Sequence, residues 1–330
     1  MKTIFQVLLV FSIISYAQKP AFDSWKYLNQ KPPGEYAKIF APGIITTGLP
    51  TRDIAITPDY KEIYFTVHGF TYNFSTILFC KYVNGKWTKP EVASFASNSK
   101  FSYTEPCISP DGTKMFFVSN RPKLNLNDGK ESYDIWMMKR ENNSWGVPQN
   151  LGEPVNTDAD EYFPSVTNEG TIYFTRESPD KSNAIYRCKL IDGKYGQAEK
   201  LPDQINFGVD RFNAFIAPDE SYIIVSVYKA KDGKGAADYY IVYRNLNDTW
   251  DAPINLGDRI NSQFNEYSPY VTRDNKYFFF MSMKPDSTLL NQTENFTANR
   301  LRTILNSPGN GGNTIYWIDA KVLPKKQLPK

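Results

Sequence analysis

The stretch ISPDGTKMFF (residues 108–117) has the pattern of a β-strand, a tight turn and a second β-strand. In the turn, Pro110 fixes φ, Asp111 can cap the turn backbone, and Gly112 can adopt a positive φ. Related stretches recur along the chain as ITPDYKEIYF (56–65), VTNEGTIYF (166–174), IAPDESYII (216–224) and VTRDNKYFFF (271–280). The acidic turn residues are 50 to 58 residues apart, so the sequence contains an internal repeat.

Two further markers follow the turns in constant order. The first is GKWTKP (85–90), NSWGVP (143–148), GKYGQA (193–198) and DTWDAP (248–253). The second is QNLGEPVN (149–156), EKLPDQIN (199–206) and INLGDRIN (254–261). Each repeat unit holds four short, aromatic-rich strand signals, and Tyr and Phe favour strands. Four antiparallel strands at this period are typical of the blades of a β-propeller.

The two ends of the chain predict how the propeller closes. In the fifth unit, residues 313–323 form the third strand, and no signal for a fourth strand follows. Residues 37–47 precede the first unit and resemble a fourth strand without a blade. We therefore predict an all-β, five-bladed β-propeller over residues 36–323, its last blade closed by the N-terminal strand. Six blades are the alternative, and would require a blade within the insertion at 285–312, where we expect a helix over 294–306 capped by Thr293.

The N-terminal residues differ in composition from the repeat. Lys2 precedes an apolar run at 4–14 and small residues that favour cleavage before Gln18, which predicts a signal peptide over 1–17. Residues 18–35 would then be an N-terminal extension, and 324–330 a C-terminal tail. No Cys follows the apolar run, and no other run is long enough to cross a membrane. The sequence predicts an exported protein, periplasmic or extracellular, without a lipid anchor or a transmembrane segment in the mature chain.

Composition argues against several classes of partner and cofactor. The formal net charge is +3 and no basic run is interleaved with aromatic residues, so nucleic acid is not an expected partner. The chain has three Cys and a single His, His68, which disfavours a metal site. We expect the thiols to be buried and no cofactor to be required. The absence of a G-x-S-x-G motif argues against a serine peptidase domain.

The second unit carries a family resemblance. ISPDGTKMFFVSNRP (108–122) followed by YDIWMMKRENNSWGVPQNLGEPVNT (133–157) resembles the TolB-type propeller repeat, a relative of WD repeats found in exported proteins of Bacteroidota-like bacteria. The fourth unit departs from the others, since Arg211 stands where they have Glu161 and Glu266. The resemblance implies a propeller and export. It implies no single activity, because such repeats occur in docking modules, in gating domains of serine peptidases and in stand-alone proteins.

The propeller architecture predicts where a site would lie. The starts of the inner strands and the loops between second and third strands converge on one mouth of the central channel. We predict that a ligand contacts His68, Tyr103, Glu105, Arg121, Glu161, Arg176, Arg211 and Glu266 there. Arginine forks would suit a carboxylate or a sugar acid, and the aromatic side chains of residues 69–74 could stack on a ligand. The alternative is that these charges pair with one another, for example Glu161 with Arg121, and hold adjacent blades together.

Two functional hypotheses follow. The first is a non-enzymatic propeller that binds a polar ligand, whether a glycan, a peptide or a protein partner, at the channel mouth. The second is a carbohydrate-active enzyme, similar to glycoside hydrolases, that uses inner-strand carboxylates; the candidates are Asp53, Glu105, Glu161 and Glu266. Basic neighbours would lower the pKa of such acids and impair a general acid. We therefore favour binding and assign no catalytic residue.

Overall fold

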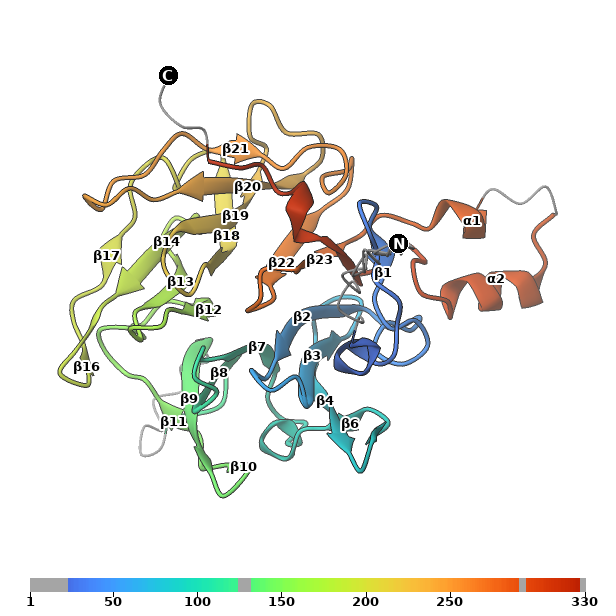
Figure 1. The fold of residues 1–330 in the computed structure, drawn as a ribbon, viewed down its shortest axis with the longest axis horizontal. Coiled ribbons are helices and arrows are strands. Elements are labelled where there is room, and N and C mark those ends of the chain that lie inside the picture. The colour runs from blue at the N-terminus through green and yellow to red at the C-terminus, as the bar shows by residue number, and fades with distance from the viewer. Residues whose placement is uncertain (1–22, 124–131, 291–294, 327–330) are drawn as a thin grey trace, which may run out of the picture.

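The computed structural model describes residues 23–123, 132–290 and 295–326. Five larger β-sheets are arranged around a common axis (Figure 1), which confirms the predicted five-bladed β-propeller, and a sixth, two-stranded sheet is formed by a small hairpin. The predicted signal peptide at 1–17 lies outside the described residues, as do positions 18–22 and 327–330 of the expected extension and tail. Within the described part, no helix is long and apolar enough to cross a membrane.

Each blade has three long antiparallel strands and a two-residue outer strand. From the channel outward, the strands are β2 (Thr51–Ile56), β3 (Glu62–His68), β4 (Ser75–Val83) and β6 (Glu91–Val92) in blade one; β7 (Tyr103–Ile108), β8 (Lys114–Ser119), β9 (Asp134–Glu141) and β11 (Gln149–Asn150) in blade two; β12 (Glu161–Val166), β13 (Ile172–Glu177), β14 (Asn183–Cys188) and β17 (Glu199–Lys200) in blade three; β18 (Asp210–Ile216), β19 (Tyr222–Tyr228), β20 (Ala237–Tyr243) and β21 (Ile254–Asn255) in blade four; and β22 (Glu266–Val271), β23 (Tyr277–Ser282), β24 (Thr314–Asp319) and β1 (Lys38–Ile39) in blade five.

Short elements complete the described fold. They are the small strands β5 (Lys86–Trp87), β10 (Ser144–Trp145), β15 (Leu190–Ile191) and β16 (Lys194–Tyr195), the 3-10 helices η1 (Ser24–Tyr27), η2 (Ser94–Ala96) and η3 (Ala320–Val322), and the helices α1 (Ser287–Leu290) and α2 (Ala298–Leu305). Strand β5 pairs with β4, β10 with β9, and β15 with β16.

The fifth blade contains strands from both ends of the chain, as the sequence predicts. Strand β1 pairs antiparallel with β24. The strand is shorter than the expected 37–47. The backbone N–H of Phe40 still donates to the carbonyl of Ile315 at 2.9 Å, but Ala41 adopts a φ of 43° and its carbonyl accepts the N–H groups of a following turn. This turn takes the chain out of the sheet toward blade one.

Aromatic side chains fill the core at this closure. Phe40 is fully buried, with its ring centroid 4.9 Å from that of Phe279 and 5.3 Å from that of Trp317. Tyr27, in the predicted N-terminal extension, packs in the same cluster with its ring 5.4 Å from Trp317. Residues before the first repeat are therefore part of the propeller core.

The insertion at 285–312 carries helices and, in its described residues, no strand. Helices α1 and α2 stand away from the ring of blades (Figure 1). Helix α2 begins at Ala298, later than expected, and its N-cap is Thr297, whose side chain accepts from the N–H of Arg300 at 3.1 Å. The expected cap, Thr293, lies outside the described residues.

The markers of the repeat have identifiable structural roles. In the turns, Asp111 accepts a hydrogen bond from the N–H of Thr113 at 3.0 Å, and Gly112 has a φ of 73°. In the last marker, Asn156 accepts from the N–H of Ile135 and donates to its carbonyl, both at 2.9 Å. The equivalent asparagines in blades three and four, Asn206 and Asn261, do the same to Ile185 and Tyr239. In blades two to four, these side chains fasten the third strand to the loop that leads into the next blade.

Candidate functional site

Every inner strand carries a β-bulge at the same position of the repeat. The pairing of the inner strand with the second strand shifts register there in all five blades. The residue at the bulge has a positive φ in each blade: Asp53 (51°), Glu105 (57°), Phe163 (52°), Asn213 (51°) and Ser268 (62°). Residues other than glycine seldom adopt this conformation, and bulges re-aim side chains next to functional sites. We call these five residues the bulge ring.

Hydrogen bonds connect the bulge ring from blade to blade. The carboxylate of Asp53 accepts from the N–H of Glu105 at 3.3 Å and from the hydroxyl of Ser268 at 2.5 Å. The carboxylate of Glu105 accepts from the N–H of Phe163 at 2.6 Å. The side-chain amide of Asn213 donates to the Ser268 hydroxyl at 3.3 Å. The ring thus binds together backbone segments that are far apart in sequence.

Two cavities lie on either side of the bulge ring. One cavity, of about 380 Å³, is lined in each blade by the residue that precedes the bulge, and we call it the mouth cavity. Its lining residues are Arg52, His68, Tyr72, Ser75, Thr104, Glu105, Val118, Tyr133, Asp160, Tyr162, Phe212, Asn213 and Tyr267.

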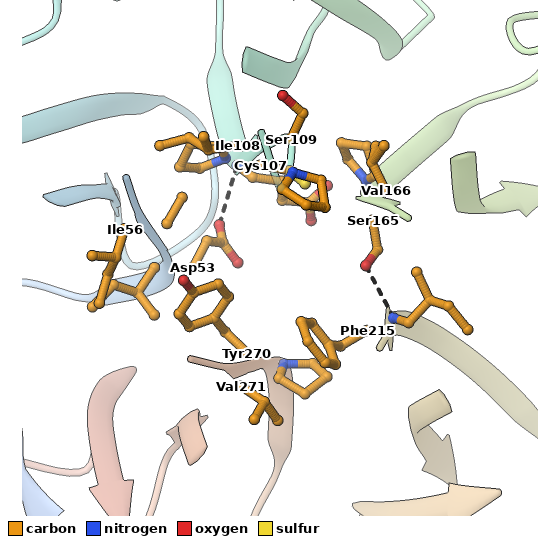
Figure 2. Close-up of a pocket in the computed structure, with 18 of the residues that line it drawn as sticks. Asp53, Ile56, Cys107, Ile108, Ser109, Ser165, Val166, Phe215, Tyr270 and Val271 are labelled. Atoms are coloured by element: carbon orange, nitrogen blue, oxygen red, sulfur yellow. Dashed lines mark hydrogen bonds between the residues drawn. The ribbon is translucent and has the colours of Figure 1, made fainter. Parts of the chain in front are cut away.

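The other cavity is a narrow tunnel of about 60 Å³, lined by the residues that follow the bulges. Figure 2 shows the residues that line it arranged around a central space, among them Ile56, Ile108, Val166 and Phe215. Six prolines also line it, namely Pro58, Pro106, Pro110, Pro164, Pro218 and Pro269. The tunnel is too small and too apolar for a polar ligand of several atoms. The mouth cavity is therefore the candidate site.

A largely buried arginine occupies the base of the mouth cavity. Arg52 donates to Asp53 at 2.9 Å and also to Glu105 in the next blade. Its guanidinium lies 4.9 Å from the ring centre of Tyr267. Burial raises the pKa of Glu105 to about 7, with the positive charge of Arg52 opposing the shift and the negative charge of Asp53 adding to it. Two carboxylates therefore share one cation.

A tyrosine from the loop after β3 covers one side of the mouth. The ring of Tyr72 stacks on His68 with centroids 4.3 Å apart, and its hydroxyl contacts those of Tyr267 and the amide of Asn313. Burial lowers the pKa of His68, so its ring is neutral at pH 7: Nδ1 donates to the carbonyl of Gly69 and Nε2 accepts from Asn313, both at 2.8 Å. Tyr72 is 51% exposed and faces the cavity from a positive φ of 56°.

Of the eight residues predicted from sequence, His68 and Glu105 line the mouth cavity. Four others, Tyr103, Glu161, Arg211 and Glu266, lie one position before the lining residue of their strands. Side chains alternate between faces of a strand, so these four point away from the channel. The structure therefore does not bring them together at the mouth, as the sequence had suggested.

Several of the predicted charged residues outside the mouth cavity have partners elsewhere in the protein. The carboxylate of Glu161 accepts from the N–H of Thr157 at 2.9 Å and from Arg176 at 2.7 Å, and Glu266 accepts from the N–H of Ser262 at 3.1 Å. Glu161 thus pairs with Arg176 rather than with Arg121 as suggested above. The guanidinium of Arg121 lies 4.8 Å from the ring centre of Trp136.

Most of the aromatic wall lies at positions that were not among the residues predicted from sequence. Tyr133, Tyr162, Phe212 and Tyr267 line the cavity from four blades. One signal was available: in three units the lining residue stands two positions before a proline, in TEP (104–106), YFP (162–164) and YSP (267–269). Among the described residues, no three His, Cys, Asp or Glu side chains are grouped so that they could hold a metal ion.

Comparisons with known proteins give distant structural similarities. No family model and no curated protein matches the sequence. A solved structure assigned to TolB from Agrobacterium tumefaciens is similar at 13% identity, covering 82% of this chain and 90% of that one, with a TM-score of 0.48. The native arabinanase of Bacillus subtilis is similar at 13% identity, covering 83% and 95%, also with a TM-score of 0.48.

A sialidase from Streptococcus pneumoniae is similar at 11% identity, with 78% of this chain aligned to 39% of that one and a TM-score of 0.42. With TM-scores below 0.5, these similarities carry no argument about the fold or the function of this chain. The chain is a β-propeller. That assignment rests on the strand pairing of its five larger sheets.

Proposed function

We propose that the protein is a non-enzymatic binding propeller that takes a polar ligand, part of a glycan, a peptide or a protein partner, into the mouth cavity. The observation that carries this proposal is the shared arginine. Arg52 holds both Asp53 and Glu105, and Asp53 also accepts from Thr104, Glu105 and Ser268. A general base or nucleophile needs a lone pair directed at the substrate, whereas the lone pairs of Asp53 are already engaged.

The walls of the cavity support binding. Tyrosine rings offer large, rigid contact surfaces together with hydroxyl groups, at little cost in conformational entropy. A volume of about 380 Å³ accommodates one or two sugar rings or amino acid residues, within the usual range of ligand sites. The exposed side chains Phe70 and Phe74 flank Tyr72 on the same loop and would extend contacts beyond the cavity.

We also propose that the protein is exported, to the periplasm or the cell exterior. The support is the order of a basic residue, an apolar run and small residues within 1–17. N-terminal sequencing of the mature protein should begin at Gln18. A mature chain that retains Met1 in the cytoplasmic fraction contradicts export.

A carbohydrate-active enzyme is the second candidate. Glu105 favours it, because this residue lines the cavity and its pKa of about 7 suits a general acid at neutral pH. In that function Glu105 would protonate a glycosidic oxygen, and a second carboxylate would have to be released from Arg52. The hydrogen bond from Arg52 to Asp53 opposes this release.

One set of experiments separates the two functions. Glycan and peptide arrays are probed with the wild type and with Tyr162→Ala, with circular dichroism to verify folding. Hits that disappear in Tyr162→Ala but persist in Tyr36→Ala, an exposed tyrosine outside the cavity, support binding at the mouth. Hits unaffected by Tyr162→Ala contradict it. Hydrolysis of any glycan in the panel that is abolished by Glu105→Gln would establish the enzyme instead.

A further inference from the structure

The charge balance of the mouth cavity restricts its ligand. Of the lining residues, all in the described part of the chain, Arg52 is the sole Lys or Arg, while Glu105 and Asp160 are acidic and Asp53 lies directly beneath. The charge of Arg52 is matched by Asp53 and Glu105. The cavity therefore carries more negative than positive charge. This charge disfavours the carboxylate or sugar-acid ligand that the sequence suggested.

Asp160 places this surplus charge beside aromatic rings. One carboxylate oxygen accepts from the N–H of Tyr133 at 2.8 Å, which fixes the side chain between the start of β9 and the start of β12. The other oxygen receives no hydrogen bond from the residues that the structure describes. This oxygen therefore retains lone pairs for a ligand. Because Asp160 is half-buried, solvent screens its charge only in part.

The aromatic wall suits a cation. Tyr133, Tyr162, Phe212 and Tyr267 line the cavity around Asp160 and Glu105. The faces of aromatic rings attract ammonium and guanidinium groups, most strongly where water is excluded. The protein already uses this chemistry in the cavity, since the guanidinium of Arg52 lies over the ring of Tyr267 with carboxylates at its edge.

We propose that the mouth cavity binds an ammonium group of its ligand, held against Asp160 within the aromatic wall. The inference rests on the proposed function, which makes the mouth a ligand site, and adds the charge of the ligand. The same chemistry is offered by the amine of a lysine side chain and by the amine of an amino sugar. Acetylation removes the positive charge from either one.

The test uses ligand pairs that differ by this acetylation. Calorimetry compares a chitosan trisaccharide with its fully N-acetylated counterpart, and an N-terminally acetylated Gly-Lys-Gly tripeptide amide with its acetyl-lysine form. In at least one pair, we expect the free amine to bind about tenfold more tightly or better, the contribution of one partly buried charge interaction. The pair that shows this preference identifies the source of the amine.

Variants locate the effect. Asp160→Asn keeps an oxygen to accept from Tyr133 and should abolish the preference for the free amine. Asp203→Asn removes the same charge from an exposed loop outside the cavity and should leave the preference intact. Tyr162→Phe should retain most of the affinity because it keeps the ring, whereas Tyr162→Leu should lose it.

Three results overturn the ammonium inference: no binding of either amine, equal binding of amine and acetylated forms, or a preference unchanged in Asp160→Asn. If array ligands of other charge still depend on Tyr162, the inference fails while the proposed function stands. If no ligand of any charge depends on Tyr162, both fail.

Discussion

The hydroxyl of Ser268 in blade five donates a hydrogen bond to Oδ1 of Asp53 in blade one, 2.5 Å away. This contact joins the first and last inner strands at the bulge ring. At the outer edge of the molecule, the pairing of β1 with β24 completes blade five from the two ends of the chain. The ring is thus closed by contacts at the channel and by strand pairing at the periphery. Mutations at the channel test the first, and mutations at the periphery test the second.

The first prediction concerns the outer part of the closure. Phe40→Ala removes a fully buried ring that contacts Phe279 and Trp317. We expect the free energy of unfolding to fall by about 3–5 kcal/mol, the usual cost of such a truncation. Urea denaturation measures the loss. Ile44→Ala, at a half-exposed position nearby, should cost less than about 1 kcal/mol, and similar losses in both variants would contradict the proposed role of Phe40.

The second prediction concerns the ion pair between blades one and two. Arg140 donates to both oxygens of Glu62, at 2.8 and 2.9 Å. Burial alone would raise the pKa of Glu62, but the hydrogen bonds and charge of Arg140 outweigh it, so the pKa lies below its ordinary value. A depressed carboxyl pKa stabilises the fold at neutral pH, and this contribution is lost as the pH falls through the folded-state pKa.

Glu62→Gln should therefore lower the free energy of unfolding by about 3 kcal/mol at pH 7, and the difference from wild type should shrink toward pH 3. Denaturant titrations at several pH values provide the measurement. Glu91→Gln, an exposed carboxylate on β6, serves as the matched control. A deficit that stays constant from pH 7 to pH 3 would rule out the pairing as its cause.

The third prediction concerns a carboxyl group whose pKa is raised rather than lowered. Burial raises the pKa of Glu105 to about 7, despite the opposing charge of Arg52. A raised pKa means that the proton on Glu105 stabilises the folded state at low pH, and that this contribution is lost as the pH rises to 7. We therefore expect the free energy of unfolding of Glu105→Gln, measured relative to wild type, to rise by about 3 kcal/mol as the pH increases from 4 to 8. A stability difference that does not vary with pH would show that Glu105 ionises normally.

The fourth prediction concerns the loop over the mouth. Tyr72→Ala removes a half-exposed ring that stacks on His68 and lines the cavity. We expect ligand affinity to fall about tenfold while the free energy of unfolding changes by less than about 1 kcal/mol. Phe74→Ala alters the same loop at a side chain outside the cavity lining, and should affect affinity less. Equal losses in the two variants would indicate that the loop acts through its backbone.

The number of blades could be predicted because the turn that marks each unit depends on local chemistry, and the closure because the fifth unit lacks a signal for its fourth strand. Asp111 and Gly112 produce a turn from interactions within a few residues, and the same turn recurs in each unit. The two-residue strand β1 was predicted too long because nothing in the sequence signals that Ala41 adopts a positive φ. Backbone conformations of this kind depend on packing against the rest of the ring.

The site was harder to predict because a shift of one residue moves a side chain to the opposite face of its strand. Tyr103 was expected at the mouth, yet the structure places Thr104 there. Glu105 nevertheless reaches the channel, because the bulge interrupts the alternation at that residue. The pairing of Arg52 with Glu105 joins residues of different repeat units and has no local signature in the sequence.

The sharing of blade five between β1 and β24 also orders events during synthesis. A nascent chain cannot complete its ring until β24 has emerged from the ribosome, because β1 has no other partner among the described strands. A premature stop before Thr314 would leave β1 and β23 with unpaired edges, which in β-proteins promote association between molecules. Truncated products of this gene should therefore aggregate rather than persist as four-bladed fragments.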